Sequence, residues 1–312
     1  MDVVQVERFG GPEVLRPATV ADPSPGPGEA VVEVTACDVM FLDTLLRAGW
    51  GDDFFPVRPP YVPGSGVVGR VEGRRVVADT KQDVGGSEIP VGGYASRAAV
   101  AESELIPVPA GLSDQQAVAL VHDGPTLQSL LSFVSGRRVL VTAAAGGAGV
   151  LLVQELVRRG VQVVGAARGE AKTSLVRSLG AASVVDYGSP TWTDGVAPVD
   201  AVLDGAGGTL GRAAFELVAD GGRFVSYGTA GGEFASPDPA SAARRGVTVI
   251  GLTDLPRLSR AHRRELVERT LSEAASGQYR PVIGQTFPLA RAADAHAAIA
   301  ARAAIGKTLL VP

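Results

Sequence analysis

A glycine-rich turn is the segment of this sequence whose spacing specifies chemistry most directly. Residues Ala144 to Gly149 form an A-x-G-x-x-G arrangement between the apolar run RVLVT and a helical pattern. Glycines in such a unit let the backbone approach a pyrophosphate, and the N–H groups that start the helix bind it. An empty structural turn is the alternative, but the strand–turn–helix context favours a dinucleotide. The predicted contacts are Ala145, Gly146, Gly147, Ala148 and Gly149.

Two cations follow, where the second strand of the unit ends. About 20 residues past the glycines, an acid binds the ribose hydroxyls of NAD, whereas a cation accommodates the 2′-phosphate of NADP. This chain has Arg168 there and Lys172 one helical turn on, which favours NADPH over the alternative of two solvated surface cations. Tyr187 ends the next strand and is expected near the adenosine or, alternatively, in a turn.

Metal ligands are scarce in this sequence. The chain has one cysteine, Cys37, and three histidines, His122, His262 and His296. A cysteine-rich zinc lobe cannot be built from these residues, and an internal disulfide is excluded. We expect Cys37 to be a small thiol in the core.

The elements that must position these residues differ along the chain. Residues 1–118 are short apolar runs broken by proline and glycine, which predicts a mostly β domain. Residues 119–258 alternate strand and helix patterns, which predicts a doubly wound parallel sheet with helices on both faces. Residues 259–312 are helical and end in KTLLVP, a strand that we expect to return to the first domain. The predicted fold class is α/β.

The first helix of the second region has a recognisable start. Ser113 stands three residues before Gln116, and Leu and Val recur at helical spacing beyond them. Side chains at this spacing accept hydrogen bonds from each other's backbone N–H groups in a capping box. We therefore expect a helix from about residue 113.

Composition and charge limit the partners of the protein. The chain has 312 residues, 46% of them hydrophobic and 20% charged, which is enough for packed domains. Its net charge is −4 with acids and bases interspersed, so nucleic acid is not an expected partner. We find no signal-peptide pattern and no run of about 18 apolar residues, and expect a cytoplasmic protein without membrane insertion.

Motifs along nearly the whole chain resemble those of one family. They are RFGGPEVL, PGPGEAVVEVTA, PYVPGSGVVG, GGYASRAAV, VTAAAGGAGVLLVQ, DAVLDGAGG, GGRFVSYG and GQTFPLARAADAHAAIAARAAIGKTLLVP. The chain resembles the zinc-independent quinone oxidoreductase branch of the medium-chain dehydrogenase/reductase superfamily. The resemblance implies a GroES-like substrate domain, a Rossmann domain that holds NADPH, and a homodimer built through the edge strand GVTVIGL.

The same resemblance implies further cofactor contacts. The backbone near Leu252 and the turn at Gly228 and Thr229 would approach the nicotinamide. Gly205, in the motif DAVLDGAGG, joins the predicted cofactor-binding residues. These positions follow the ends of expected strands, where a dinucleotide lies in such folds.

The resemblance also bears on zinc. Metal-dependent members of the superfamily hold a catalytic zinc with cysteines and a His-Glu pair, and this chain has Ser65 and Gly66 in place of that pair. Without a metal to polarise a carbonyl, reduction of an electron-poor acceptor is the natural chemistry. We expect NADPH-dependent hydride transfer to a quinone or another activated carbonyl or alkene.

On the substrate side, the chain departs from the family pattern. Met40 replaces the usual asparagine, and Leu45 replaces an aromatic residue that is often tyrosine. Asp43 matches the family, and a catalytic role and a helix-start hydrogen bond are equally open for it.

Three polar residues match positions where the family contacts nicotinamide and substrate. They are His122, Asp123 and Thr126, which we expect at the mouth of a helix. A histidine near neutrality is a candidate proton donor, since the proton must otherwise come from water. A structural histidine with satisfied hydrogen bonds is the alternative.

Aromatic residues near residues 50–61 are a further candidate substrate wall. Trp50, Phe54, Phe55 and Tyr61 suit a flat aromatic acceptor, although buried aromatics more often belong to the core. The predicted substrate contacts are therefore Met40, Leu45, Trp50 and Tyr61.

Two other functions stay open at this point. An enoyl-thioester reductase resembles this branch, but it relies on the tyrosine that Leu45 replaces. A sensor that binds NADPH without turnover is the second, and a hydride-transfer assay separates it from an enzyme.

Overall fold

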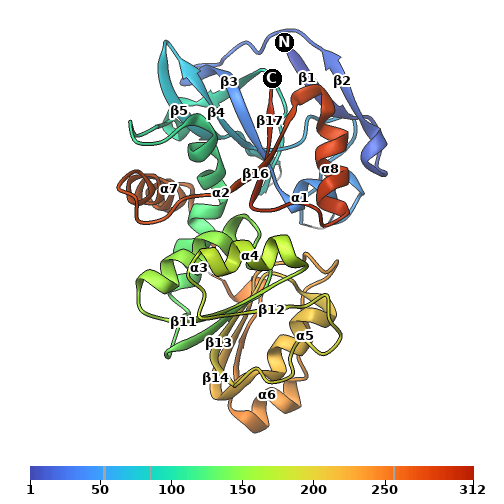
Figure 1. Ribbon diagram of the computed structural model, residues 1–312. Helices are drawn as coiled ribbons and strands as arrows, with labels where there is room; N and C mark the ends of the chain where they lie inside the picture. The colour runs from blue at the N-terminus through green and yellow to red at the C-terminus, as the bar shows by residue number, and fades with distance from the viewer. Residues whose placement is uncertain (52–53, 85, 256) are drawn as a thin grey trace. The chain divides into compact units, whose positions relative to one another are not determined.

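The computed structural model describes residues 1–51, 54–84, 86–255 and 257–312. In this part of the chain, the contacts divide the residues into two units (Figure 1). Unit 1 comprises Met1–His122, Arg264–Ser276 and Pro281–Pro312, and unit 2 comprises Asp123–Arg263 and Gly277–Arg280. The sequence places the domain limits at 118/119 and 258/259, and these limits remain a prediction.

Unit 1 is built on mostly antiparallel strands. Among the described residues, its main sheet has seven strands in the order β16-β17-β3-β4-β5-β9, with β8 paired to β3. These strands are β3 (Glu29–Val39), β4 (Gly66–Val71), β5 (Arg74–Asp79), β8 (Arg97–Ala101), β9 (Ile106–Pro107), β16 (Ile283–Pro288) and β17 (Lys307–Val311). Shorter ladders pair β1 (Asp2–Val6) with β2 (Leu15–Thr19) and β6 (Gln82–Val84) with β7 (Ser87–Ile89).

The first third and the last residues of the chain share this sheet. Strand β17 pairs antiparallel with β3, so the C-terminal strand returns to the sheet of the N-terminal region. The helical elements of this unit are η1 (Pro12–Val14), α1 (Phe41–Arg47), η2 (Glu102–Glu104), η4 (Leu289–Arg291) and α8 (Ala292–Ala300). Valines of β3, β4 and β5 pack with Leu310 and Ala295 in its core, because alternate residues of these strands face inward.

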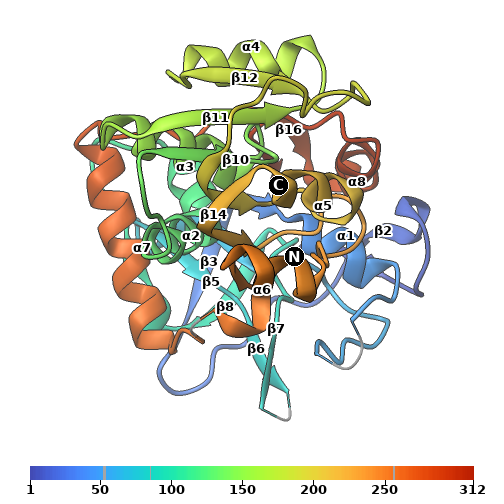
Figure 2. The same ribbon diagram turned by 90° about the horizontal axis from the view of Figure 1, so that it is seen from below.

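Unit 2 is a doubly wound parallel sheet. Over the described ranges, its six strands follow the order β12-β11-β10-β13-β14-β15, which is the order 3-2-1-4-5-6 of dinucleotide-binding folds. The strands are β10 (Arg138–Val141), β11 (Gln162–Ala167), β12 (Ser183–Asp186), β13 (Val199–Asp204), β14 (Val218–Ser226) and β15 (Thr248–Ile250). Helices α3 (Gly147–Arg158) and α5 (Gly208–Glu216) lie on opposite faces of this sheet (Figure 2).

The remaining elements complete the two units. They are α4 (Glu170–Ser178), α6 (Pro239–Arg245), η3 (Leu252–Asp254), and two helices that cross the unit limits, α2 (Asp114–Leu131) and α7 (Arg260–Ala275). The predicted fold class is confirmed: a parallel Rossmann-like sheet and an antiparallel β domain.

Helix α2 confirms one local prediction and corrects another. Its start is a capping box, in which Gln116 N–H donates to Ser113 Oγ (3.1 Å) and Ser113 N–H donates to Gln116 Oε1 (3.0 Å). The expectation that His122, Asp123 and Thr126 lie at the mouth of a helix is wrong, since all three lie inside α2. The helix continues through Pro125 because Leu127 and Leu130 beyond it are fully buried in the core.

Candidate active site

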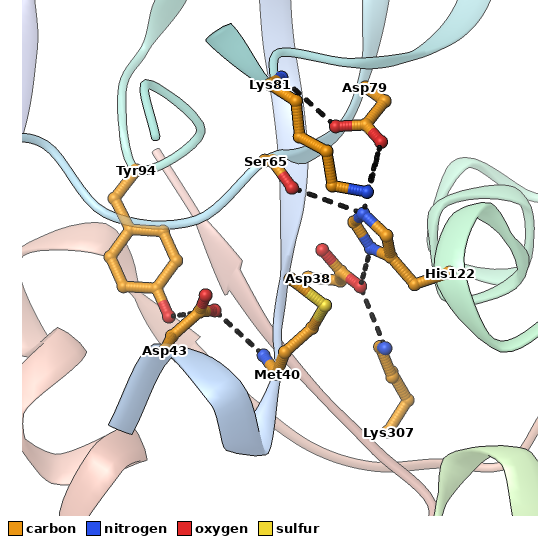
Figure 3. A network of polar contacts seen from close by, with 9 residues as sticks. All are labelled: Asp38, Met40, Asp43, Ser65, Asp79, Lys81, Tyr94, His122 and Lys307. Carbon is orange, nitrogen blue, oxygen red and sulfur yellow. Dashed lines mark hydrogen bonds and ion pairs between the residues drawn. The ribbon is translucent and has the colours of Figure 1, made fainter. Parts of the chain in front are cut away.

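An ion cluster surrounds His122 in unit 1 (Figure 3). The Nδ1 atom of His122 lies 2.9 Å from Asp38 Oδ2, and its Nε2 atom lies 3.2 Å from Ser65 Oγ. The Oδ2 atom of Asp79 is 3.6 Å from the same Nε2. Both ring nitrogens therefore face acceptor oxygens, which is the arrangement that holds an imidazolium with two N–H donors.

Two lysines complete this cluster. Lys307 Nζ lies 2.8 Å from Asp38 Oδ2, and Lys81 Nζ lies 2.9 Å from Asp79 Oδ2. The sheet brings them together, because Asp38 on β3 pairs with Leu309 of β17, and Asp79 at the end of β5 pairs with Gly66 of β4. A buried charge needs a partner, and here each carboxylate has a lysine and shares the histidine.

The cluster fixes the charges of its members. Burial opposes ionisation of Asp38, but the charges of Lys307 and His122 outweigh it and lower the pKa of Asp38 to about 2. Burial likewise opposes the charge of His122, but Asp38 and Asp79 outweigh it and raise the pKa of His122 to about 9. At neutral pH, His122 is therefore a cation between two carboxylates.

A glycine makes room for this ion pair. A Cβ atom at Gly66 would lie 2.4 Å from Asp38 Oδ1 and 2.9 Å from His122 Cε1. Real Cβ contacts are essentially never this short, so any larger residue at position 66 would displace the carboxylate or the imidazole ring. Gly66 stands at the position of the acid in the His-Glu pair of zinc-dependent members. Because it has no side chain, it leaves the space that the Asp38–His122 pair fills.

A second network lies around Asp43 in the same unit (Figure 3). The backbone N–H of Met40 donates to Asp43 Oδ2 (2.9 Å), which is the helix-start hydrogen bond considered for this residue. The hydroxyl of Tyr94 donates to the same oxygen (3.1 Å). Because Oδ2 accepts both bonds, a proton on Asp43 belongs on Oδ1, a buried atom that has no hydrogen-bond partner among the described residues.

The network continues from Tyr94 to helix α8. The Nε2 atom of His296 lies 2.9 Å from Tyr94 Oη, and Arg47 Nη1 lies 3.4 Å from His296 Nδ1. An arginine can only donate, so His296 Nδ1 accepts, and its Nε2–H donates to Tyr94. Burial lowers the pKa of His296 to about 3 and raises the pKa of Asp43 to about 7. The series of contacts therefore runs from the charged Arg47, through neutral His296 and Tyr94, to the Asp43 carboxyl, which titrates near neutrality.

The other residues considered for substrate contact lie around α1. Met40 directly precedes α1 and Leu45 lies within it; both are half-buried. Trp50 and Phe54 are 40% and 64% exposed, whereas Phe55 and Tyr61 pack against a small apolar cluster that contains Leu46. The aromatic set thus divides into two exposed and two packed side chains.

The glycine turn of unit 2 connects β10 to α3. Gly146 is the N-cap residue, and Gly147, Ala148 and Gly149 form the first turn of the helix. A Cβ atom at Gly149 would lie 2.4 Å from the carbonyl oxygen of Ala143, so only glycine lets the helix pack this closely on the strand. Ala145 is buried below the turn, and the N–H of Gly146 donates to the carbonyl oxygen of Ala143 (2.9 Å). Residues 147 and 148 are half-exposed in the first turn of the helix, where N–H groups have no acceptor within the helix.

The predicted phosphate-binding cation lies beyond β11, at the same edge of the sheet. The guanidinium of Arg168 lies over the ring of Tyr187, 5.9 Å from its centre. Lys172 is in the first turn of α4. Asp186 accepts hydrogen bonds from the backbone of Gly169 (3.0 Å) and Gly188 (2.7 Å), so its carboxylate fixes these turns. The structure thus brings Arg168 and Tyr187 together at the adenosine side expected for a dinucleotide.

The remaining cofactor candidates follow β13, β14 and β15. Gly205 lies after β13, Gly228 and Thr229 lie after β14, and Leu252 begins η3 and is 49% exposed. A Cβ atom at Gly205 would lie 2.6 Å from the hydroxyl of Tyr227. Parallel strands end at one edge of a sheet, so these residues share the edge that also holds the glycine turn.

Of the helix α2 candidates, Asp123 and Thr126 belong to unit 2. The Asp123 carboxylate lies against Gly147, while Thr126 is half-buried about one turn further along the helix. His122, by contrast, belongs to unit 1 and its ion cluster.

Sequence reasoning missed the partners of His122 and Asp43. Asp38 lies inside an apolar strand and Lys307 begins another, and buried charges of this kind require partners, which was a usable signal. No local sequence pattern marked Tyr94, His296 and Arg47, because the contacts between them depend on the packing of α8 and α1. Tyr227 was likewise unmarked within the strand motif GGRFVSYG.

Known proteins resemble this chain along its length. A family model described as zinc-binding dehydrogenase matches residues 179–310. The chain is 31% identical to a quinone oxidoreductase of Pseudomonas aeruginosa, over 99% of this chain and 99% of the relative. It is 29% identical to a quinone oxidoreductase of Sus scrofa, over 100% of this chain and 98% of the relative. In the described residues, we find no helix long and apolar enough to cross a membrane.

Solved structures agree with this relationship. A mycobacterial protein complexed with NADPH has a TM-score of 0.87 and 29% identity, with all of both chains covered. The quinone oxidoreductase of Thermus thermophilus, also solved as a complex with NADPH, has a TM-score of 0.81 and 32% identity over all of both chains. The chain therefore belongs to the quinone oxidoreductase family of the medium-chain dehydrogenase/reductase superfamily.

Proposed function

We propose that the protein is an NADPH-dependent oxidoreductase that reduces a quinone or another activated carbonyl or alkene without zinc. The observation that carries the proposal is the glycine turn at the start of α3, with Arg168 at the end of the next strand. Relatives named quinone oxidoreductase and structures solved with NADPH support the same reading.

The residues present fit such a cofactor. The N–H groups of the half-exposed residues 147 and 148 would hold its diphosphate at the positive end of α3. Arg168 and Lys172 would hold the 2′-phosphate, with Tyr187 beside the adenosine. Gly205, Gly228, Thr229 and Leu252 would lie along the rest of the dinucleotide at the strand ends. Bound NADPH supplies the hydride, and the role of the chain is to hold and orient it.

Zinc is not part of the proposal, because the donor set does not suit a cation. In the ranges the structure covers, no group of three or more His, Cys, Asp or Glu side chains could hold a metal ion. Asp38 and Asp79 already pair with Lys307 and Lys81, whose positive charges would repel a metal. Without a Lewis acid, the acceptor must itself be electron-poor, as quinones and activated alkenes are.

His122 takes a structural role in this proposal. Its two ring nitrogens face Asp38 and Ser65, and the pKa of about 9 keeps it protonated through neutral pH. In this imidazolium form, both N–H groups are directed at the oxygens of the cluster. We therefore assign the proton of the reduced product to water.

Partners and location complete the proposal. The acceptor is a small molecule, and the assembly is a homodimer through β15, whose residues Thr248 and Val249 are exposed at the edge of the sheet. The cytoplasmic location is taken from the sequence expectation alone.

Chelation tests the zinc-free reading. The purified protein is dialysed against a strong chelator, and NADPH oxidation with a small quinone is compared before and after, and again after zinc is added. We expect one unchanged rate throughout. A rate that disappears on chelation and returns with zinc contradicts the proposal.

A further inference from the structure

Asp123 places a negative charge on the glycine turn of unit 2. It projects from α2, and a Cβ atom at Gly147 would lie 2.1 Å from its Oδ2 atom and 3.3 Å from its Oδ1 atom. Both carboxylate oxygens thus face the first residue of α3. A larger residue at position 147 would displace this carboxylate, so the glycine lets Asp123 approach the turn.

This position matters because of the helix that starts there. Helix α3 has 12 residues, and its first N–H groups have no acceptors within the helix. Its N-terminus carries partial positive charge and favours an anion. A carboxylate beside Gly147 and a diphosphate on the turn would share this positive end, where their negative charges would repel each other.

The charge of Asp123 also reaches the neighbouring strand end. Burial raises the pKa of Tyr227, and the charges of Asp204 and Asp123 raise it further. The hydroxyl of Tyr227 lies beside Gly205, one of the proposed cofactor contacts. Asp123 therefore acts on the same edge of the sheet from the side of α2.

We propose that Asp123 is an affinity-determining residue of the dinucleotide site: its carboxylate weakens binding of the diphosphate, so that the cofactor exchanges readily between turnovers. This inference rests on the proposed function, because it concerns the same cofactor. Asp123 would lower the affinity for the nucleotide, whereas Arg168 would raise it. Arg168 would act on the 2′-phosphate of NADPH alone, whereas Asp123 acts on the diphosphate that NADPH and NADH share.

The test is a titration of the full-length Asp123→Asn variant with NADPH and with NADH, followed by nucleotide fluorescence. Asparagine keeps the shape of the side chain and removes its charge. We expect both dissociation constants to fall by roughly tenfold at low salt, with slower release of the nucleotide. The gain should shrink at high salt, because screening weakens the repulsion that the substitution removes.

The matched control is Asp220→Asn. Asp220 is an exposed acid of the same unit, near the start of β14, and it pairs with Arg245 at 3.3 Å. This variant removes the same charge from unit 2, away from the glycine turn. We expect its nucleotide affinities to equal those of the unchanged protein. Asp123→Ser serves as a second uncharged variant, and thermal melting confirms that each protein is folded.

The outcomes separate the inference from the proposed function. Unchanged affinity in both Asp123 variants overturns the inference, and so does weaker affinity, which would make the carboxylate an acceptor for a cofactor hydroxyl. In either case, NADPH binding and turnover by the unchanged protein leave the proposed function standing. If the unchanged protein and its variants all bind neither nucleotide, the proposed function fails and the inference fails with it.

Discussion

Two carboxyl groups near Met40, five residues apart in sequence, differ in charge because their surroundings differ (Figure 3). Asp38 has Lys307 and His122 beside it, which outweigh its burial and hold its pKa at about 2. Asp43 accepts hydrogen bonds from Met40 and Tyr94, but its burial, together with the nearby charge of Asp38, outweighs them and raises its pKa to about 7. Chemically identical side chains thus serve as a fixed anion and as a carboxyl that titrates near neutrality.

The charge of His122 gives a prediction for a single side chain. In the unchanged protein, the imidazole signals of His122 in an NMR titration should shift with a pKa of about 9. Asp38→Asn removes one of its two anions, so the pKa of His122 should fall by at least about one unit toward 6.5. Titration of His122 near 6.5 in the unchanged protein would contradict the ion cluster.

The sign of the linked stability follows from this shift. Because the pKa of His122 is raised in the folded state, its contribution is fully present below about pH 6.5 and is lost as the pH rises through about 9. Asp38→Asn should therefore destabilise the protein more at pH 6 than at pH 10.

Arg168 gives a second prediction for a single residue. Arg168→Ala should weaken NADPH binding by about 1 to 3 kcal/mol, the scale of a charge-assisted hydrogen bond, and leave NADH nearly unchanged. Dissociation constants for both nucleotides, measured by fluorescence titration, check this. Equal losses for the two nucleotides would assign Arg168 a general role, such as its stacking on Tyr187.

At the scale of elements, the polar series from Arg47 to Asp43 connects α1 to α8. It passes through His296 and Tyr94, which are both fully buried. Since Arg47 and Asp43 lie four residues apart on α1, the series leaves and rejoins the same helix. We therefore expect ionisation of Asp43 to affect the packing of α1 against α8 as well as the Asp43 side chain itself.

The Asp43→Asn variant tests this link. The raised pKa of Asp43 means that the folded state holds a proton that the unfolded state has lost, so stability should fall as the pH rises from about 4 through about 7. Asparagine stays neutral, and the stability of the variant relative to the unchanged protein should rise by about 2 to 4 kcal/mol across that range. Urea unfolding at several pH values measures it.

Glu102→Gln is the control for this series, because Glu102 is an exposed acid of the same unit. Its stability difference from the unchanged protein should stay constant with pH. A constant difference in Asp43→Asn as well would show that Asp43 is ionised throughout the range.

Elements could be predicted from the sequence wherever the signal was local. Ser113 and Gln116 marked the start of α2, and the glycine turn marked the start of α3. The partners of His122 could not be predicted in this way, since Asp38 lies 84 residues away in sequence and meets it only through the sheet. The sequence placed His122, Asp123 and Thr126 at the mouth of a helix. This was wrong, because α2 continues through Pro125 and all three residues lie in its interior.

At the scale of the whole molecule, the order of motifs was the most informative feature of the sequence. It predicted the parallel and antiparallel sheets and the family, and both predictions are confirmed. The chemistry of the acceptor is less accessible, because Met40 and Leu45 depart from the family pattern where the substrate is expected. Charged residues in apolar strands, such as Asp38 and Lys307, indicate that buried partners exist. Which charges meet around His122 depends on register between distant strands, and no local pattern encodes that choice.

We propose that this molecule binds NADPH and passes its hydride to an electron-poor acceptor. The most direct measurement is a fluorescence titration of the purified protein with NADPH and NADH, followed by addition of a small quinone to the NADPH complex. We expect tighter binding of NADPH than of NADH, and rapid oxidation of NADPH when the quinone is added. Tight binding of NADPH, with oxidation no faster than in buffer for quinones and activated alkenes alike, would contradict it and identify a protein that binds the cofactor without turnover.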